Sequence, residues 1–347
     1  MDAESNKRII FIVGNSRSGT TMLGRILGNH PQIYTFGELH FFEHLVSDKE
    51  VKNDISWTHE KNVSLLRRLL TSSREGFFSS VKSNNYEKDI SDVLKSCDSS
   101  NPVRVYEDFL RYEAIANGKV IPCEQTPRYL FSSRDIFRLF PEARIINLVR
   151  DPRDVLLSQK NKWRRRFLGA KNIPIMEAFR AWANYHPFTI SRLWLSAIRA
   201  ASLQEKNPHF MTVRFEDLVS FPEENVEKIC KFVGIPFQCD MLDVPHVGSS
   251  TGKDKHEKLG VDSARSGGWM NGGLSDLEIE VCESVVKEEM IKYGYIPEKH
   301  GVNFTSLIVC FFSLFIKTPL TLLLNIKRSR NICNSIKKRF FIRGNTT

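Results

Sequence analysis

The feature that most constrains this chain is a short glycine-containing loop near its beginning, Gly14–Thr21, with the sequence GNSRSGTT. The residues before it, Arg8–Val13, are mostly apolar and β-branched, which is typical of a buried parallel strand. After the loop, apolar residues recur at helical spacing over Met22–Leu27. The order strand, loop, helix points free backbone N–H groups and the positive end of the helix at one spot. We therefore predict that this loop binds an anion, usually a phosphate.

The loop is similar to the Walker A motif, G-x-x-x-x-G-K-[ST], with one difference. Thr20 stands where that motif has the lysine that reaches the terminal phosphates of ATP, and Arg17 brings a cation two residues before Gly19. The missing lysine argues against a kinase or NTPase of the P-loop type, which stays an alternative. The other alternative is a strand-to-helix turn without a ligand.

A second strand-to-helix junction follows later in the chain. The apolar run Arg144–Val149 predicts another buried strand, and Arg150 stands at its end. Pro152 comes next at a position where proline begins helices well. Ser158 then lies about two turns into the predicted helix.

The two junctions resemble the nucleotide-binding motifs of sulfotransferases that use 3′-phosphoadenosine 5′-phosphosulfate (PAPS). The segment RSGTT resembles the family's 5′-phosphosulfate loop, and VRDPRDVLLS, which begins at Val149, resembles its 3′-phosphate site. The resemblance runs from about Arg8 to about Pro297. It implies that PAPS is the co-substrate and PAP the product, with a forked guanidinium on the 3′-phosphate. The resemblance implies that the nucleotide is bound by Arg17, Ser18, Gly19, Thr20, Thr21, Arg150 and Ser158.

A carboxylate follows the next predicted strand, Ile33–Phe36, at the sheet edge where α/β enzymes bind ligands. This residue, Glu38, can take the proton that an acceptor hydroxyl must lose as it attacks sulfur. The segment resembles tyrosylprotein sulfotransferases and their bacterial relatives, in which a glutamate at this distance from the loop is the base. A surface or helix-capping role for Glu38 is the alternative, and His40 and His44 are the next candidates for the base.

The chain departs from the family pattern at one position. The strand that precedes Thr126 resembles a family strand ending in Glu-Lys-Thr-Pro, whose lysine helps to hold the sulfuryl group. Here that position is Gln125, which can donate a hydrogen bond but brings no charge. We expect Arg17 to carry more of the electrostatic load, or Arg128 to substitute. Together with Glu38, Arg17 is a predicted catalytic residue.

The pattern as a whole predicts an α/β fold of the P-loop type, with three layers and helices on both faces of a parallel sheet. We expect one sulfotransferase domain over residues 1–300 and a basic hydrophobic tail over 301–347. The polar stretch 48–101 is interpreted as an insertion that covers the acceptor site. A further strand is predicted at Phe210–Phe215, and the helical run Ile175–Leu203 is expected to divide at Pro187.

The Gly/Ser-rich stretch Asp240–Asn271 is expected to be a mobile loop of the kind that closes over the nucleotide in this family, with Ser263, Arg265 and Trp269 as candidates for closure. The seven cysteines include no C-x-x-C pair. We find no metal-ligand spacing, so we expect reduced thiols and no metal. The first five residues are polar and do not resemble a signal peptide, so a cytoplasmic location is expected.

The tail differs in composition from the rest of the chain. Phe304–Ile316 has no charged residue, Lys317-Thr318-Pro319 interrupts it, and a second apolar run follows. From Lys317 to the end there are eight basic residues and no acidic one, so most of the +10 net charge lies here. The broken run predicts an interfacial or re-entrant segment at an anionic membrane surface. A helix packed back on the domain is the alternative.

These patterns predict a sulfotransferase that moves a sulfuryl group from PAPS to a hydroxyl or amine by in-line displacement. The expected acceptor is a glycan, a lipid or a small alcohol, and no nucleic-acid partner is expected because the body of the chain is nearly neutral. A non-catalytic nucleotide-binding protein on the same scaffold stays an alternative, supported by Gln125.

Overall fold

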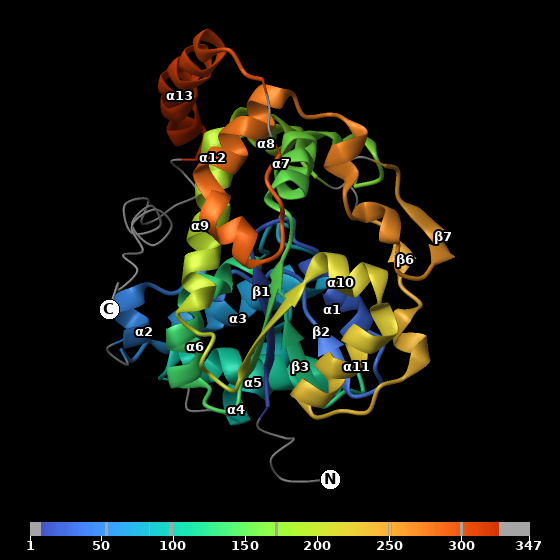
Figure 1. Cartoon of the computed structure of the whole chain (residues 1–347). Coiled ribbons are helices and arrows are strands. Elements are labelled where there is room, and N and C mark those ends of the chain that lie inside the picture. The colour runs from blue at the N-terminus through green and yellow to red at the C-terminus, as the bar shows by residue number, and fades with distance from the viewer. Residues whose placement is uncertain are drawn as a thin grey trace.

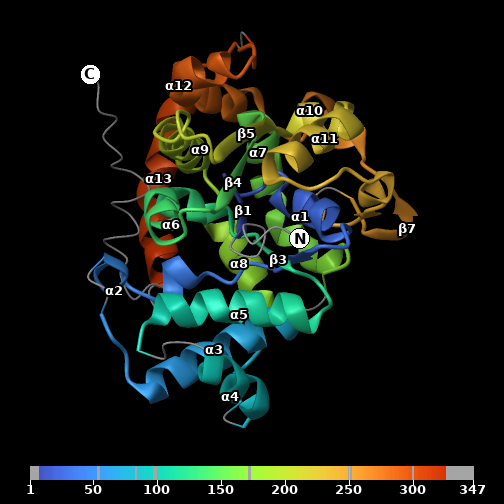
Figure 2. The same cartoon turned by 90° about the horizontal axis from the view of Figure 1, so that it is seen from below.

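The computed structural model describes residues 8–325, apart from positions 53–54, 83, 97–99, 171–172, 249, 251 and 299–300. A five-stranded parallel sheet runs through the centre of the molecule, with helices on both faces (Figures 1 and 2). In spatial order the strands are β2 (Ile33–Thr35), β3 (Ile121–Glu124), β1 (Ile10–Gly14), β4 (Arg144–Val149) and β5 (Phe210–Arg214). The predicted three-layer α/β class is confirmed.

The central strand, β1, pairs with β3 on one side and with β4 on the other. All five of its residues are buried, as expected for a parallel strand covered on both faces. The chain continues from β1 to β2 on one side and later adds β4 and β5 on the other, so the strand order reverses between β1 and β4. Ligands of open α/β sheets bind at such a reversal. It places the loop after Gly14 beside Arg150.

One face of the sheet is covered by the helix that follows β1 and the two helices that follow β5. Ile10 and Ile12 of β1 pack on this side with Leu23, Ile26 and Val226, all of them fully buried. The helices are α1 (Thr20–Gly28), α10 (Phe215–Ser220) and α11 (Pro222–Val233). Because α1 is anchored by this apolar face, its amino-terminal end is held at the carboxyl edge of β1.

The opposite face buries the alternate residues of β1. Phe11 and Val13 pack there with Leu66, Ile90 and Phe109. The helices on this side are α2 (Asp48–Lys52), α3 (His59–Arg74), α4 (Glu87–Ser96), α5 (Pro102–Ala116) and α6 (Ser133–Leu139). The predicted insertion over residues 48–101 therefore shares the core of the domain instead of forming a unit of its own.

A third cluster of buried residues lies beyond the edge of the sheet, among α7 (Pro152–Lys160), α9 (Pro187–Ser202) and α12 (Asp276–Lys292). It contains Val155, Trp194 and Cys282. The helical run that was expected to divide at Pro187 does so, into α8 (Ile175–Ala183) and α9. This arrangement holds α7, and with it Ser158, next to the loop.

The stretch Asp240–Asn271 carries more local structure than the sequence predicted. It contains a short antiparallel pair, β6 (Pro245–His246) and β7 (Lys255–Leu259), and three turns of 3₁₀-helix. β6 has only two residues and β7, with the sequence KHEKL, is exposed throughout, so neither shows the apolar–polar alternation by which a strand is predicted.

The interruption predicted in the apolar tail is wrong. A single helix, α13 (Phe304–Asn325), runs through Lys317 and contains Pro319. The Lys317 ammonium donates to the backbone carbonyl of Tyr185 at 2.9 Å, so its charge is turned toward the domain and away from the apolar face. The residues after Asn325, which include seven of the eight basic residues of the tail, lie outside the described residues.

Candidate functional site

The loop between β1 and α1 needs glycine at both ends. Gly14 has φ 149°, and a Cβ there would lie 2.5 Å from the backbone oxygen of Leu148. Gly19 has φ 95° and begins α1, and a Cβ there would lie 2.4 Å from the Phe215 ring. Between them Arg17 has φ 76°, an uncommon conformation for a residue with a side chain. The loop is therefore held in one shape by contacts with β4 and α10.

The side chain of Arg17 meets α7. Its Nε donates to Ser158 Oγ at 2.9 Å, although 141 residues separate the two in the chain. Ser158 Oγ also lies 2.8 Å from Ser250 Oγ. Arg150, at the end of β4, donates from Nη1 to the backbone oxygen of Arg17 at 3.2 Å. The structure thus brings together the two halves of the predicted nucleotide site.

Two buried polar atoms at this junction have no hydrogen-bond partner among the described residues. They are Ser18 Oγ, which can donate, and Arg150 Nε. The Arg150 guanidinium also lies over the Phe215 ring, 4.4 Å from its centroid. Burial, together with the charges of Arg165 and Arg150, lowers the pKa of Arg17 to about 9. An oxyanion such as a phosphate would accept hydrogen bonds from the unpartnered donors and would reduce the repulsion between the neighbouring cations.

Gln125 lies beside the loop, where the sequence placed it. Its Nε2 donates to Thr21 Oγ1 at 3.4 Å, and its side chain fills the space next to Gly24. Arg128, the suggested substitute, lies near the predicted base: its Nη1 is 3.7 Å from a carboxylate oxygen of Glu43, and its charge acts on Glu38. Lys162, which the sequence analysis did not assign to the site, interacts electrostatically with both Arg17 and Glu38.

The predicted closing segment packs on the start of α7. Asp154 accepts hydrogen bonds from the backbone of Gly267 at 2.9 Å and of Trp269 at 3.0 Å. The backbone oxygen of Arg265 accepts from Arg150. Trp269 is buried, with the Arg153 guanidinium 3.9 Å from its ring centroid. Arg265 therefore reaches the nucleotide site through its backbone, whereas Trp269 packs in the core.

Glu38 lies in the segment after β2, and its side chain is 45% exposed. One of its carboxylate oxygens lies 3.1 Å from Nε2 of His40, whose Nδ1 lies 3.1 Å from a carboxylate oxygen of Glu43. His40 has φ 55° and precedes a π-helical turn, Phe41–Leu45. Backbone outliers and π-turns of this kind cluster at functional sites.

The charges around Glu38 keep it ionised. Burial by itself would raise its pKa, but the hydrogen bond from His40 and the positive charges of Lys162 and Arg128 outweigh burial and lower the pKa of Glu38. Burial disfavours the charged, protonated form of His40, yet the two flanking carboxylates raise the pKa of His40 to about 9. At neutral pH the pair is therefore a carboxylate beside an imidazolium, and Glu38 is the member able to accept a proton.

Reasoning from sequence missed three features of this region. Glu43 stands on the far side of His40, Ser250 joins Ser158, and the buried Glu124 accepts a hydrogen bond from the backbone of Leu39 at 3.1 Å. Only Glu43 had a possible signal, since a residue three positions after His40 shares its face of a helical turn.

Residues 9–239 match the model of the family described as "Sulfotransferase family". The nodulation protein NoeE of Sinorhizobium fredii is 26% identical over 233 residues, which cover 65% of this chain and 50% of NoeE. Human sulfotransferase 2A1 is 27% identical over 174 residues, which cover 42% of this chain and 58% of that enzyme. The chain thus spans about half the length of these relatives, and the family match includes both the loop and the Arg150 segment.

Two solved structures are also similar. The sulfotransferase domain of the Synechococcus PCC 7002 olefin synthase is 21% identical with a TM-score of 0.48, over 80% of this chain and 94% of that one. Mouse sulfotransferase SULT7A1, solved in complex with PAP, is 11% identical with a TM-score of 0.42, over 82% of this chain and 85% of that one.

Proposed function

The chain belongs to the sulfotransferase family, as its match over residues 9–239 shows, and from this premise we propose that it moves a sulfuryl group from PAPS to a hydroxyl or amine. PAPS supplies the sulfuryl group, and the nucleotide PAP is the leaving group. The acceptor that we propose is a glycan, a lipid or a small alcohol.

The observation that supports this proposal most is the junction of Arg17, Ser158 and Arg150 at the point where the strand order reverses. Two phosphate-binding elements meet there, one at the start of α1 and one at the start of α7. A nucleotide with phosphates at both its 5′ and 3′ positions has the charges to engage both elements, and AMP would engage only one. The unpartnered Ser18 Oγ and Arg150 Nε are donors that such phosphates would satisfy.

The residues divide the chemistry between them. Glu38, held ionised by His40, takes the proton of the acceptor as the acceptor attacks. Arg17 and the backbone N–H groups of Gly19, Thr20 and Thr21 stabilise the negative charge that develops on the departing phosphate. Such preorganised electrostatic stabilisation usually contributes most to catalysis. Ser18, Arg150 and Ser158 would fix the nucleotide.

Incubation with labelled PAPS and a panel of hydroxyl acceptors tests the proposal, with product mass measured for each acceptor. We expect a gain of one sulfuryl group in at least one acceptor class and formation of PAP. Magnesium-dependent turnover of ATP would indicate the kinase or NTPase alternative. Tight PAP binding without transfer to any acceptor would favour the non-catalytic alternative, which the neutral Gln125 beside Thr21 supports.

We also propose that α13 attaches the protein to the cytoplasmic face of an anionic membrane. The helix includes a stretch, Thr305–Asn325, that is long and apolar enough to cross a membrane, with mean hydropathy 2.2, and none of it is buried. Its apolar side chains stay outside: Phe312, Phe315, Ile316 and Leu323 are each at least 67% exposed. In both views the helix lies at the outside of the molecule (Figures 1 and 2).

The other side of α13 is fastened to the domain. Arg180 donates to the backbone oxygen of Leu324 at 2.9 Å, and the His186 ring lies 3.1 Å from the backbone oxygen of Cys310. Phe179 and Trp182 of the neighbouring α8 are exposed as well. A helix held on one side and apolar on the other favours attachment along the membrane surface over a free span.

A further inference from the structure

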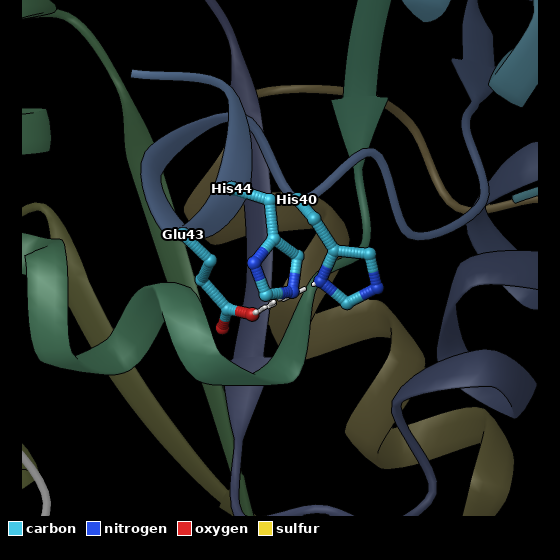
Figure 3. A group of neighbouring side chains, drawn as sticks. All are labelled: His40, Glu43 and His44. Atoms are coloured by element: carbon cyan, nitrogen blue, oxygen red, sulfur yellow. Dashed lines mark hydrogen bonds and ion pairs between the residues drawn. The ribbon is translucent and has the colours of Figure 1, made fainter. Parts of the chain in front are cut away.

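Three potential metal ligands lie together next to the proposed base. Nδ1 of His40 is 3.1 Å, and Nε2 of His44 is 3.7 Å, from the same carboxylate oxygen of Glu43. All three ligand atoms lie within 4.8 Å of one another. Figure 3 shows the two imidazole rings side by side, with the Glu43 carboxylate reaching toward them.

The local backbone creates this cluster. His40 adopts the left-handed conformation and Phe41–Leu45 forms a π-helical turn, so the side chains at positions 40, 43 and 44 emerge on one side. The Phe77 ring lies against both imidazoles, with ring centroids 4.6 Å from His40 and 6.3 Å from His44. The rings are therefore held in place from outside the turn as well as by their own backbone.

Two imidazoles and one carboxylate form a ligand set that suits zinc, in the combination of a site that keeps a fourth position open. In a tetrahedral zinc site the ligand atoms lie about 3.3 Å apart, given zinc–ligand bonds of about 2.0–2.1 Å. The observed 3.1 and 3.7 Å bracket that separation. The His44 side chain is 31% exposed, so solvent reaches the cluster on that side.

An independent contact supports the same conclusion. A histidine that binds a metal almost always donates its other ring N–H to a carboxylate or carbonyl, which fixes its tautomer. His40 has such a partner, since its Nε2 lies 3.1 Å from a carboxylate oxygen of Glu38. If a metal binds to His40, Glu38 is therefore already in place as the outer carboxylate that orients the His40 ring.

We propose that His40, Glu43 and His44 bind one Zn²⁺ ion. Nδ1 of His40, Nε2 of His44 and the Glu43 carboxylate would be the ligands, with water in the fourth position. Zinc binding displaces the proton that His40 Nδ1 shares with Glu43 and releases it to solvent. The proton on His40 Nε2 stays in place and is still donated to Glu38. This replaces the expectation of no metal, and it does not depend on the sulfotransferase proposal.

Metal analysis of tag-free, full-length protein tests the site. The protein is equilibrated with zinc, dialysed against metal-free buffer and analysed for bound metal, and cobalt is titrated separately for its tetrahedral absorption bands. The variants are His44→Ala, Glu43→Gln and Glu38→Gln. His256→Ala is the matched control, because it removes an exposed histidine of β7 far from the cluster in the sequence. Circular dichroism establishes that each variant is folded.

We expect about one zinc per chain in the unmodified protein and in His256→Ala. His44→Ala and Glu43→Gln should bind zinc at least about tenfold more weakly, and Glu38→Gln, which loses only the outer carboxylate, about 10–100-fold more weakly. Absence of bound zinc and of cobalt bands in the unmodified protein would overturn the proposal. So would zinc binding that His44→Ala and Glu43→Gln leave unchanged, since the ion would then lie elsewhere.

Discussion

At the scale of single residues, the site gathers more cations than carboxylates. Burial, and after it the repulsion from neighbouring cations such as Arg165, lowers the pKa of both Arg17 and Lys162. The carboxylates beside them are Glu38, Asp154, which lies 3.6 Å from Arg150, and Asp254, which interacts with Arg165; they are fewer than the cations Arg17, Arg150, Arg165 and Lys162. A ligand with several negative charges is therefore expected to bind strongly. Removal of any one cation should weaken most the binding of the ligand group that lies next to it.

The first prediction concerns the 3′-phosphate. Arg150→Ala should reduce discrimination between PAP and AMP by about 1.5–3 kcal/mol, the contribution of a hydrogen bond to a charged group. Calorimetry with both nucleotides measures this. Arg134→Ala, which removes an exposed arginine of α6, is the control and should bind like the unmodified protein. Equal affinity of the unmodified protein for PAP and AMP would contradict the nucleotide assignment.

The second prediction concerns the base. Glu38→Gln keeps the shape of the side chain but cannot take a proton, so turnover should fall by roughly 10²–10⁴-fold while PAP binding is retained. His40→Gln should cost less, because His40 acts through Glu38. Single-turnover transfer from labelled PAPS measures both. If Glu38→Gln transfers sulfate normally, the base is another residue, and His40 or His44 is the next candidate.

The third prediction concerns a buried proton. Burial raises the pKa of Glu124 to about 8, although Thr126 and the backbone of Leu39 donate hydrogen bonds to it. Cys123, Tyr106, Tyr129, His40 and Glu38 are titratable groups that interact with it. From pH 4.5 to about 8 the folded state keeps this proton and the unfolded state has lost it. Stability should therefore fall with rising pH in this window, by about 1.4 kcal/mol per pH unit.

Glu124→Gln isolates that contribution, since an amide does not titrate. The free energy of unfolding of the variant, minus that of the unmodified protein, should rise between pH 5 and 8 and then level off. Chemical denaturation at four pH values measures the difference. A difference that does not change with pH would show that Glu124 is ionised in the folded protein.

At the scale of elements, the site depends on the packing of α1 and α10 against the sheet. The loop reaches its shape because Phe215, the first residue of α10, fills the space beside Gly19. The amino-terminal end of α1, at Gly19, and the guanidinium of Arg150 both lie against this ring. A displacement of Phe215 should therefore disturb both halves of the nucleotide site at once.

Gly19→Ala tests this coupling. The added methyl group would lie 2.4 Å from the Phe215 ring, and φ 95° is strained for alanine. We expect a loss of about 1–3 kcal/mol in stability and a marked loss of PAP affinity. Thermal unfolding and calorimetry measure the two effects. Gly37→Ala is the matched control for stability, because a Cβ there meets nothing within 4 Å; unchanged PAP binding by Gly19→Ala would mean that the loop adapts.

At the scale of the whole molecule, we expect the nearly neutral domain and the basic end of the chain to have different functions. A chain that ends at Gly301 should stay folded and soluble and still bind PAP, because α13 contributes no residue to the cores around the sheet. The full chain should sediment with anionic vesicles and be partly released by high salt. Each basic residue near such a surface adds about 1 kcal/mol, and salt screens this attraction.

Vesicle sedimentation and unfolding, measured in parallel for the full chain and for the chain that ends at Gly301, test both expectations. A full chain that stays in solution with anionic vesicles at low salt would contradict membrane attachment. Unfolding of the shorter chain would show that α13 is part of the fold. Release by detergent alone would mean deeper insertion than the surface attachment proposed here.

Local sequence predicted β1, β2, β4 and β5, the helices that follow them, and the places of Arg17, Arg150 and Glu38 after strands. These features repeat over a few residues or recur at a turn, so neighbours in the chain are enough to predict them. The remaining strand of the sheet, β3, was predicted from the resemblance to the family, and all five strands are present.

Tertiary structure alone decided which of these ends meet. Ser158 reaches Arg17 across 141 positions because β4 pairs with β1, and no local pattern contains that pairing. The proton on Glu124 depends on burial by the elements around it. The docking of α13 uses Arg180 of α8 and His186, just before α9, which contact backbone oxygens of the helix. The grouping of His40, Glu43 and His44 combines their spacing in the chain with the left-handed conformation of His40, which the sequence does not predict.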